Sequence, residues 1–334
     1  MKVSSFHALL LAAACLSAQA TADFKVTPGA TIKAATSKNV NFVKQWTLKA
    51  SATTKTIDSI DLSLAGNAYI SYVSNLPTGV IGYVNVSGDS RAVVNAVTVS
   101  KDVDNDLDND NDLDDLFDSD NDKGGELNVW LGNKATSGYL LTEIFLASPD
   151  AVTDVKSQRS ASVVIEDGVL VTEGKRAKLQ IDATGSSAVY VSAPETAVNV
   201  RQLSLETTGS AKIEYSVESI NARSEFQLDA QGSSSITVLS SAVKTRQLEL
   251  DAVKSSKICI NAAEVGATWR DIQGKNKISM SPDAAKKHGT TGTFACKESK
   301  LPVRQAALIT GPTSVDIDDL DDDLDNDLND STED

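Results

Sequence analysis

Apolar residues recur along the chain in one frame. The frame reads apolar-x-apolar-x-x-x-Gly-x-x-x-apolar-x-apolar, and four segments fill it, at 60–72, 179–191, 203–215 and 226–238. A fifth copy at 248–260 has Lys254 in place of the glycine, and weaker copies begin at Val84 and near Gly274. The strong copies after residue 179 start 22–24 residues apart. Such regularity predicts an array of stacked repeats.

Each copy predicts two short strands joined by a sharp corner. Apolar positions two residues apart lie on one face of a strand, because side chains alternate between the two faces. Glycine admits positive φ and marks the corner between the strands. A third apolar position follows at Ile220, Val243 and Val265. A unit with one apolar face cannot bury that face alone, so we expect neighbouring units to stack into a continuous core.

Two architectures suit this repeat, a parallel β-helix and an antiparallel β-sandwich of hairpins. The near-constant period, without Asn-Gly or Pro-Gly turns between strands, favours the all-β, right-handed parallel β-helix. At about 23 residues per coil, residues 23–101 and 123–300 predict roughly 11 coils in a rod on the order of 50 Å long. We expect two inward rows, one of Ile181, Leu205, Leu228 and Leu250, the other of Val189, Ile213, Ile236 and Ile258.

Four of these segments also resemble a known family. The stretches "LQIDATGSSAVYV", "LSLETTGSAKIEY", "FQLDAQGSSSITV" and "LELDAVKSSKICI" are similar to the repeats of the auto-transporter adhesin head GIN domain family. The resemblance is good over about 179–260 and faint over 60–100. It implies a secreted or surface β-helical domain with no established catalytic residues.

Acidic residues are concentrated in two tracts. The 334-residue chain has a net charge of −15, and residues 102–122 and 316–334 each hold 11 acidic residues. Removing these 22 acids from a mature charge of −16 leaves a body of about +6. We therefore expect N-terminal coils at 23–101, a disordered acidic insertion at 102–122, the main β-helix at 123–300 and an acidic tail at 301–334.

The first 22 residues predict a secretory signal peptide. Lys2 precedes an apolar run at 8–16, and small residues follow at Ala18-Gln19-Ala20 and Ala20-Thr21-Ala22. The alternative is a lipoprotein leader lipidated at Cys15. No later stretch is apolar for the roughly 18 residues that a membrane-spanning helix needs. The chain is therefore expected outside the cell or at its surface.

Export changes how the remaining cysteines and two asparagines are interpreted. Cys259 and Cys296 are an even pair, which favours a disulfide over two buried free thiols. Asn85 and Asn329 stand in Asn-x-Ser sequons and would accept glycans if the secreting cell is eukaryotic.

Two sets of charged residues follow the repeat period. One arginine stands before the first strand of successive units, and an acidic residue recurs three positions into that strand. An arginine ladder could hold an acidic polysaccharide, because guanidinium groups bind carboxylates in bidentate fashion. Alternatively, the two ladders neutralise each other on a solvated face. The members are Arg176, Arg201, Arg223 and Arg246, and Asp182, Glu206, Asp229 and Asp251.

The acidic tracts resemble a calcium loop at first sight. An EF-hand counted from Asp102 needs Gly and Glu where Leu107 and Leu113 stand. A specific metal site is therefore not expected. Loose binding of divalent cations is expected on charge grounds, and the alternative is a solvated disordered segment. The residues concerned are Asp104, Asp106, Asp108, Asp110 and Asp112.

These patterns favour a secreted, non-enzymatic protein, an adhesion-type or structural surface component that binds extracellular or cell-wall polysaccharide or a surface protein. One alternative is a β-helical lyase or hydrolase acting on acidic cell-wall polysaccharide, which would need carboxylates clustered in one groove. Another is a secreted divalent-cation-binding protein. No P-loop, dinucleotide fingerprint or zinc spacing occurs, so no cofactor is expected. The chain is neither basic nor rich in aromatic residues, so nucleic acid is not an expected partner.

Overall fold

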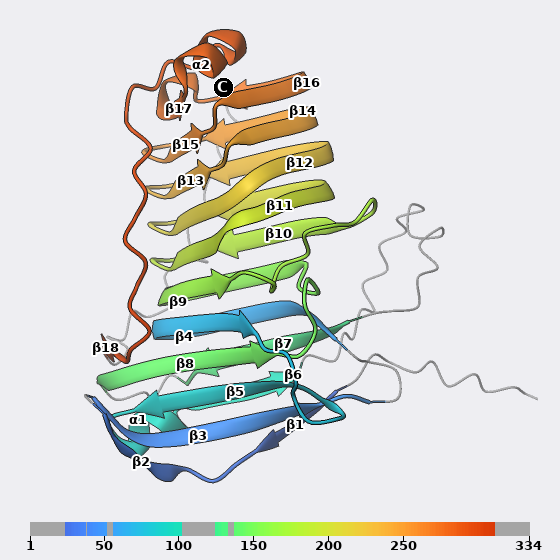
Figure 1. Ribbon diagram of the computed structural model, residues 1–334. Helices are drawn as coiled ribbons and strands as arrows, with labels where there is room; N and C mark the ends of the chain where they lie inside the picture. Colours follow the sequence, from blue (N-terminus) through green and yellow to red (C-terminus); the bar gives the residue numbers. More distant parts are fainter. Residues whose placement is uncertain (1–23, 38, 52–55, 102–123, 133–136, 311–334) are drawn as a thin grey trace, which may run out of the picture.

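Strands dominate the computed structural model, which describes residues 24–37, 39–51, 56–101, 124–132 and 137–310 (Figure 1). The elements are β1 (Lys25–Pro28), β2 (Ile32–Ser37), β3 (Val40–Lys49), β4 (Ile57–Tyr72), β5 (Val80–Gly88), α1 (Arg91–Asn95), β6 (Val97–Lys101), β7 (Gly125–Leu131), β8 (Gly138–Leu146), β9 (Asp154–Glu166), β10 (Lys178–Ala183), β11 (Ala188–Thr207), β12 (Lys212–Ala230), β13 (Ser235–Leu239), β14 (Ala242–Ala252), β15 (Lys257–Asn261), β16 (Glu264–Gln273), a 3-10 turn (Lys275–Lys277), β17 (Ile278–Met280), α2 (Pro282–His288) and β18 (Ala307–Ile309).

The repeats form a parallel β-solenoid of about five turns, which confirms the predicted fold class. Residue pairs one repeat apart lie opposite each other, as Leu205 pairs with Leu228 and Leu228 with Leu250. One sheet runs through β7, β4, β9, β10, β11, β12, β14 and β16, and we call it the first sheet. The second sheet runs through β8, β4, β9, β11, β12, β13, β15 and β17. The long strands β4, β9, β11 and β12 serve both sheets.

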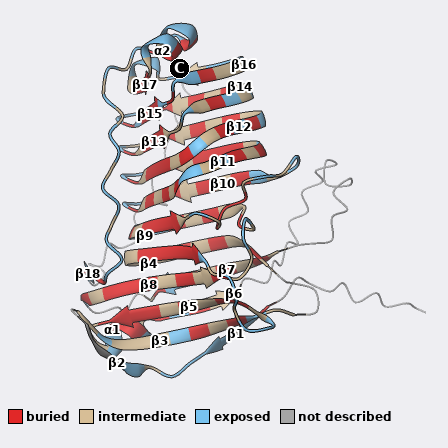
Figure 2. Cartoon of the chain, in the orientation of Figure 1, coloured by how far each residue is buried: buried red, intermediate tan, exposed pale blue. Residues whose placement is uncertain are grey.

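The core lies between the two sheets, and buried residues recur on successive rungs (Figure 2). All eight residues of the two predicted inward rows are fully buried, so that assignment is confirmed. The third apolar position is also inward, since Ile220, Val243 and Val265 are buried. Burial of aliphatic side chains contributes about 25 cal/mol per Å² of apolar surface removed from water.

The predicted corners have the expected backbone. Gly185, Gly209 and Gly232 have φ values of 70°, 76° and 82°, in the left-handed region that favours glycine. Lys254 stands at the equivalent corner with φ 59°, so a residue with a side chain adopts the same conformation there. The corner, rather than the glycine itself, is the repeated feature.

The N-terminal part differs from the expected coils. Apart from β4, the strands of residues 24–101 pair antiparallel, β1 and β2 with β3, β3 with β5, β5 with β8 and β6 with β7. The copy expected at Val84 is therefore wrong, because Val84 pairs antiparallel with Trp46 and Ile144. The segment after β4 reverses the chain, with positive φ at Asn75 and Gly79. A chain that reverses cannot continue a parallel coil, and the rod has about five turns rather than eleven.

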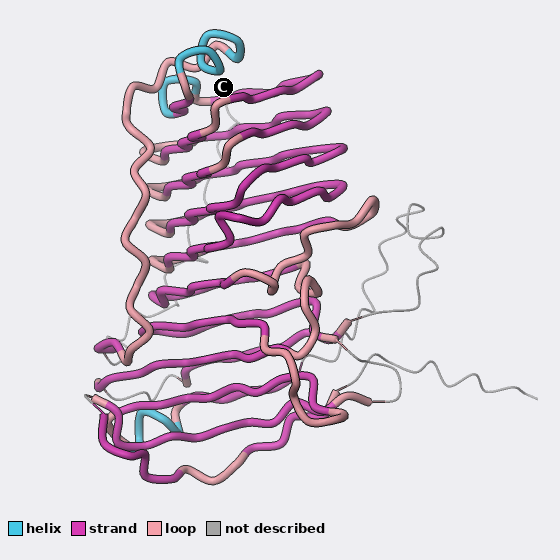
Figure 3. The backbone as a smooth tube through the Cα atoms, in the orientation of Figure 1, coloured by secondary structure: helices cyan, strands magenta, loops and turns pink. Residues whose placement is uncertain are grey.

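The C-terminal end also departs from the expected tail. Residues 289–310, which we call the strap, leave α2 and run back along the rod to β18 (Figure 3). There β18 pairs antiparallel with β8, Leu308 lying opposite Tyr139. The expected boundary at 301 is thus wrong, since residues 301–310 belong to the folded body. Residues 102–122 and 311–334 lie outside the described residues.

Candidate functional site

The four predicted arginines form a column at one corner of the rod, and we call them the Arg ladder. The register of β11 against β12 shifts between Val200 and Gln202, and that of β12 against β14 between Ala222 and Glu225. Such irregularities bend a strand and redirect its side chains. Arg201, Arg223 and Arg246 stand at or beside these shifts, and all three are exposed.

Hydrogen bonds tie three members of the ladder, Arg201, Arg223 and Arg246, to the preceding rung. Arg201 Nε donates to the carbonyl oxygen of Arg176 at 3.3 Å, and Arg223 Nε donates to Asn199 Oδ1 at 3.0 Å. Arg246 donates from Nη2 to Ser224 Oγ at 3.5 Å. These acceptors are neutral, so they orient the guanidinium groups without cancelling their charge. The ladder is therefore a line of exposed positive charge with one arginine per rung.

The predicted acidic ladder is also in register, but on the first sheet. Asp182 pairs with Glu206, Glu206 with Asp229 and Asp229 with Asp251. Glu206 follows Arg201 by five residues on the same strand, a separation of about 16 Å at the rise of an extended chain. Charges so far apart are largely screened at physiological ionic strength, where the Debye length is about 8 Å. Glu206 therefore does not neutralise the charge of Arg201, as the alternative interpretation of the two ladders would require.

A neighbouring column adds further acids to the same face. Asp154, Gln180, Ser204, Gln227, Glu249 and Asp271 succeed one another across the rungs. Lys156 lies opposite Asp182, and its Nζ is 3.6 Å from Asp154 Oδ2. This outward surface of the first sheet, which we call the acidic face, is thus crowded with carboxylates.

Burial raises the pKa of several carboxyl groups on the acidic face. Burial raises the pKa of Asp182 to about 6, although Gln180 Nε2 donates a 3.0 Å hydrogen bond to its Oδ2. Burial also raises the pKa of Asp154, Asp229 and Glu249. The Oδ1 atoms of Asp154, Asp182, Asp229 and Asp251 are buried without a hydrogen-bond partner. The neutral forms of Asp154, Asp182 and Asp229 are favoured because burial takes part of each carboxylate out of water, and this outweighs the contacts from Lys156, Gln180 and Gln231.

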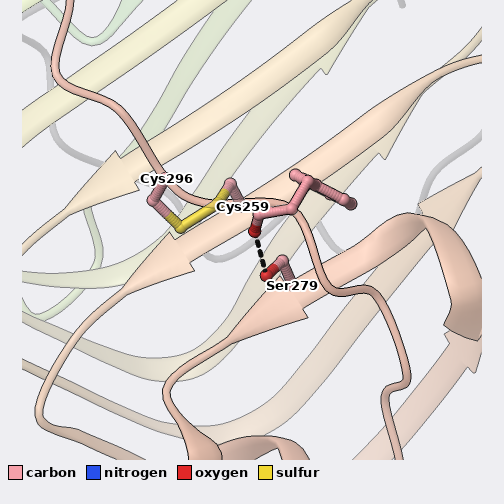
Figure 4. Close-up of a disulfide and its surroundings, with 4 residues drawn as sticks. Cys259, Ser279 and Cys296 are labelled. Carbon is pink, nitrogen blue, oxygen red and sulfur yellow. Dashed lines mark hydrogen bonds between the residues drawn. A yellow bond between two sulfur atoms is a disulfide. The ribbon is translucent and has the colours of Figure 1, made fainter.

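The predicted cysteine pair forms a disulfide between Cys259 of β15 and Cys296 of the strap (Figure 4). Their Cα atoms are 5.4 Å apart. Ser279 Oγ of β17 donates to the carbonyl oxygen of Phe294 at 2.6 Å. The strap is therefore joined to the last rungs covalently and by hydrogen bonds.

The rest of the strap is anchored by residues that sequence patterns do not single out. The Ser299 amide donates to both carboxylate oxygens of the buried Glu214 at 3.0 Å. Arg304 lies 2.6 Å from Glu166 and 3.5 Å from Glu143, and its guanidinium lies over the ring of Tyr69. The strap has no apolar alternation, so Cys296 was its one signal in the sequence.

The remaining predicted site residues fall in different places. Asn85 lies within β5, half-buried, with its Oδ1 accepting a 2.9 Å hydrogen bond from Gln45 Nε2. Asp104, Asp106, Asp108, Asp110, Asp112 and Asn329 lie outside the described residues.

Metal ligands do not converge in the part of the chain that the structure describes, where no group of three or more His, Cys, Asp or Glu side chains is placed to hold an ion. Among the same residues, no helix is long and apolar enough to cross a membrane. Comparison of the chain with protein-family models, curated proteins and solved structures finds no match.

Proposed function

We propose that the protein is a secreted, non-enzymatic β-solenoid, an adhesion-type or structural surface component that binds acidic polysaccharide along the Arg ladder. The observation that supports this is the column of Arg201, Arg223 and Arg246, exposed on successive rungs and hydrogen-bonded to neutral groups. A polymer with carboxylates at regular intervals could meet one guanidinium after another. Arginine suits this contact because its planar fork matches a carboxylate bidentately.

Two further features are consistent with this role. A disulfide persists in oxidising compartments, which agrees with the expected export of the chain. The acidic face would repel an anionic polymer from the first sheet, so binding would be confined to the arginine corner. The resemblance of the repeats to the head GIN domain family points to the same class of surface protein.

The test compares binding of the mature chain to polygalacturonate with binding of a triple variant, Arg201→Gln, Arg223→Gln and Arg246→Gln. A matched control, Lys275→Gln, Lys286→Gln and Lys300→Gln, removes the same charge from exposed positions elsewhere. We expect the arginine variant to lose at least about tenfold in affinity at low salt and the control to lose less than about threefold. Equal losses in the two variants would contradict a specific ladder.

The same samples test the alternatives. Release of new chain ends from polygalacturonate by the wild-type protein would favour the polysaccharide-degrading enzyme and overturn the non-enzymatic role. Stoichiometric calcium binding by calorimetry, without polysaccharide binding, would favour the cation-binding protein.

A further inference from the structure

A pocket of about 160 Å³ lies on the outward side of the first sheet, where β4 is flanked by β7 and β9. Ser63 of β4 pairs with Trp130 of β7 on one side and with Gln158 of β9 on the other. Neighbouring strands are about 4.8 Å apart, so the Trp130 and Gln158 positions are separated by about 10 Å. Only the short side chain of Ser63 stands between them. The pocket is the space that a longer side chain at this position would fill.

The pocket is also lined by polar side chains from the neighbouring row. Asp61 of β4 and Asn128 of β7 pair with each other, two residues before Ser63 and Trp130. Alternation along the strands puts them on the same outward side. Among the described residues, no hydrogen bond is formed by the side chains of Asn128 and Gln158. Their amide groups, which both donate and accept, are therefore available to a ligand.

Trp130 gives the pocket an aromatic wall. Its side chain is 37% exposed, although it stands within a sheet rather than at a loop tip. An indole ring combines a flat apolar face with an N–H donor at its edge. A sugar ring has the complementary character, because its C–H groups form an apolar face and its hydroxyl groups surround the edge. The combination of Trp130 with Asn128 and Asp61 thus matches a sugar ring better than a purely apolar or purely polar ligand.

Size and charge narrow the choice of sugar. Pockets for drug-sized ligands have volumes of about 300–1,000 Å³, so this smaller pocket takes a single ring. Among the described residues its lining includes one acidic residue, Asp61, and no basic residue. Lys156 lies opposite Asp61 but does not line the pocket, and its Nζ is 3.6 Å from Asp154 Oδ2. The carboxylates of the acidic face would repel an acidic sugar, so an uncharged ring is favoured.

We propose that this pocket binds one neutral hexose residue of a glycan. The sugar ring stacks on Trp130, and its hydroxyl groups form hydrogen bonds with Asn128 and Asp61. Few polar groups suffice to orient such a ligand, because the aromatic wall already fixes the plane of the ring. The site lies apart from the Arg ladder and recognises an uncharged sugar, so it goes beyond the proposed function and does not rest on it.

The experiment uses the three tryptophans of the chain, Trp46, Trp130 and Trp269, as reporters. The mature chain is labelled with 5-fluorotryptophan and titrated with methyl glucoside, methyl galactoside and methyl mannoside. We expect at least one sugar to shift the ¹⁹F resonance of Trp130 saturably, with a dissociation constant of about 1–10 mM. The resonances of Trp46, which is buried, and of Trp269, which is more exposed than Trp130, should not move.

Two substitutions test the shape and the polar half of the pocket. Ser63→Leu fills the space beside Trp130 and should weaken the sugar by at least about tenfold. Ser235→Leu is the matched control, because Ser235 is a half-buried strand residue of β13 that does not line the pocket, and its effect should be less than about twofold. Asn128→Ala should weaken the sugar by at least about threefold through the lost hydrogen bond.

A comparison of ligands tests the preference for an uncharged ring. The methyl hexuronide that corresponds to the bound sugar should bind at least about threefold more weakly at low salt. Asp61→Asn should reduce this difference, because it removes the carboxylate nearest to the ligand. This comparison and the titration of the labelled wild-type chain need no substitution that perturbs folding.

Three results would overturn the proposal. The first is an unmoved Trp130 resonance with all three sugars up to about 100 mM, tenfold above the weakest expected dissociation constant. The second is an equal shift of the Trp269 resonance, which would show nonspecific stacking on exposed indoles. The third is tighter binding of the hexuronide. The variant with Arg201→Gln, Arg223→Gln and Arg246→Gln should keep the Trp130 response, so failure of the Arg ladder and failure of this pocket are distinguishable.

Discussion

Gly232 lies directly over Gly209 in the stack of corners, and a Cβ atom on Gly232 would be 2.6 Å from the carbonyl oxygen of Gly209. Both residues have positive φ, at 82° and 76°. The corners stack because the rungs repeat in register, so the backbone of one turn occupies the space that a side chain of the next would need.

Gly232→Ala should therefore destabilise the protein by about 2–3 kcal/mol, from the left-handed backbone and from the contact with Gly209. Lys254→Gly at the equivalent corner should instead leave stability unchanged or raise it by up to about 1 kcal/mol, since Lys254 already has φ 59°. Urea unfolding midpoints measure both changes. Equal destabilisation by the two substitutions would show that backbone conformation does not decide these corners.

Leu228→Asp should unfold or severely destabilise the rod, because Leu228 is fully buried between Leu205 and Leu250. Leu228→Ala should cost about 2–5 kcal/mol through the cavity that it leaves. Gln227→Asp is the matched control, since Gln227 points outward and is half-buried. Thermal melts would contradict the assignment if Gln227→Asp cost as much as Leu228→Asp.

Cys259→Ala with Cys296→Ala should cost about 3–4 kcal/mol, the entropy of a loop whose ends are 37 residues apart in sequence. Because Ser299 and Arg304 still anchor the strap, exchange of amide hydrogens should quicken around Phe294 while β18 stays protected. The reduced wild-type protein should have the same melting temperature as the double variant. A reduced protein as stable as the oxidised one would contradict a stabilising disulfide.

Asp182→Asn should stabilise the protein at pH 7 relative to wild type. The pKa of Asp182 is raised from 3.8 to about 6, so the folded state holds its proton more tightly than the unfolded state. Its contribution to stability is then fully present below about pH 4 and is lost as the pH rises through about 6. The stability that Asp182→Asn gains over the wild-type protein at pH 7 should disappear at pH 3.5. Glu195→Gln, at an exposed position, is the charge-matched control and should show no such pH-dependent gain.

The inward rows and the corners could be predicted from the sequence because both depend on local rules. Alternation puts Leu205 and Leu228 on one face of their strands, and a period of 22–24 residues puts them opposite each other in successive turns. The glycines mark where the backbone needs positive φ. The column of Arg201, Arg223 and Arg246 follows from the same period.

Three features were decided by the tertiary structure alone. The direction in which β5 pairs depends on how the chain turns between Tyr72 and Val80, and the apolar pattern of a strand is the same in either direction. The strap is held by Ser299 and Arg304 through polar contacts to distant rungs, which leave no periodicity in the sequence. The strands β1 and β6 lie close together only in the folded chain, because they are far apart in the sequence and pair with different neighbours, β3 and β7.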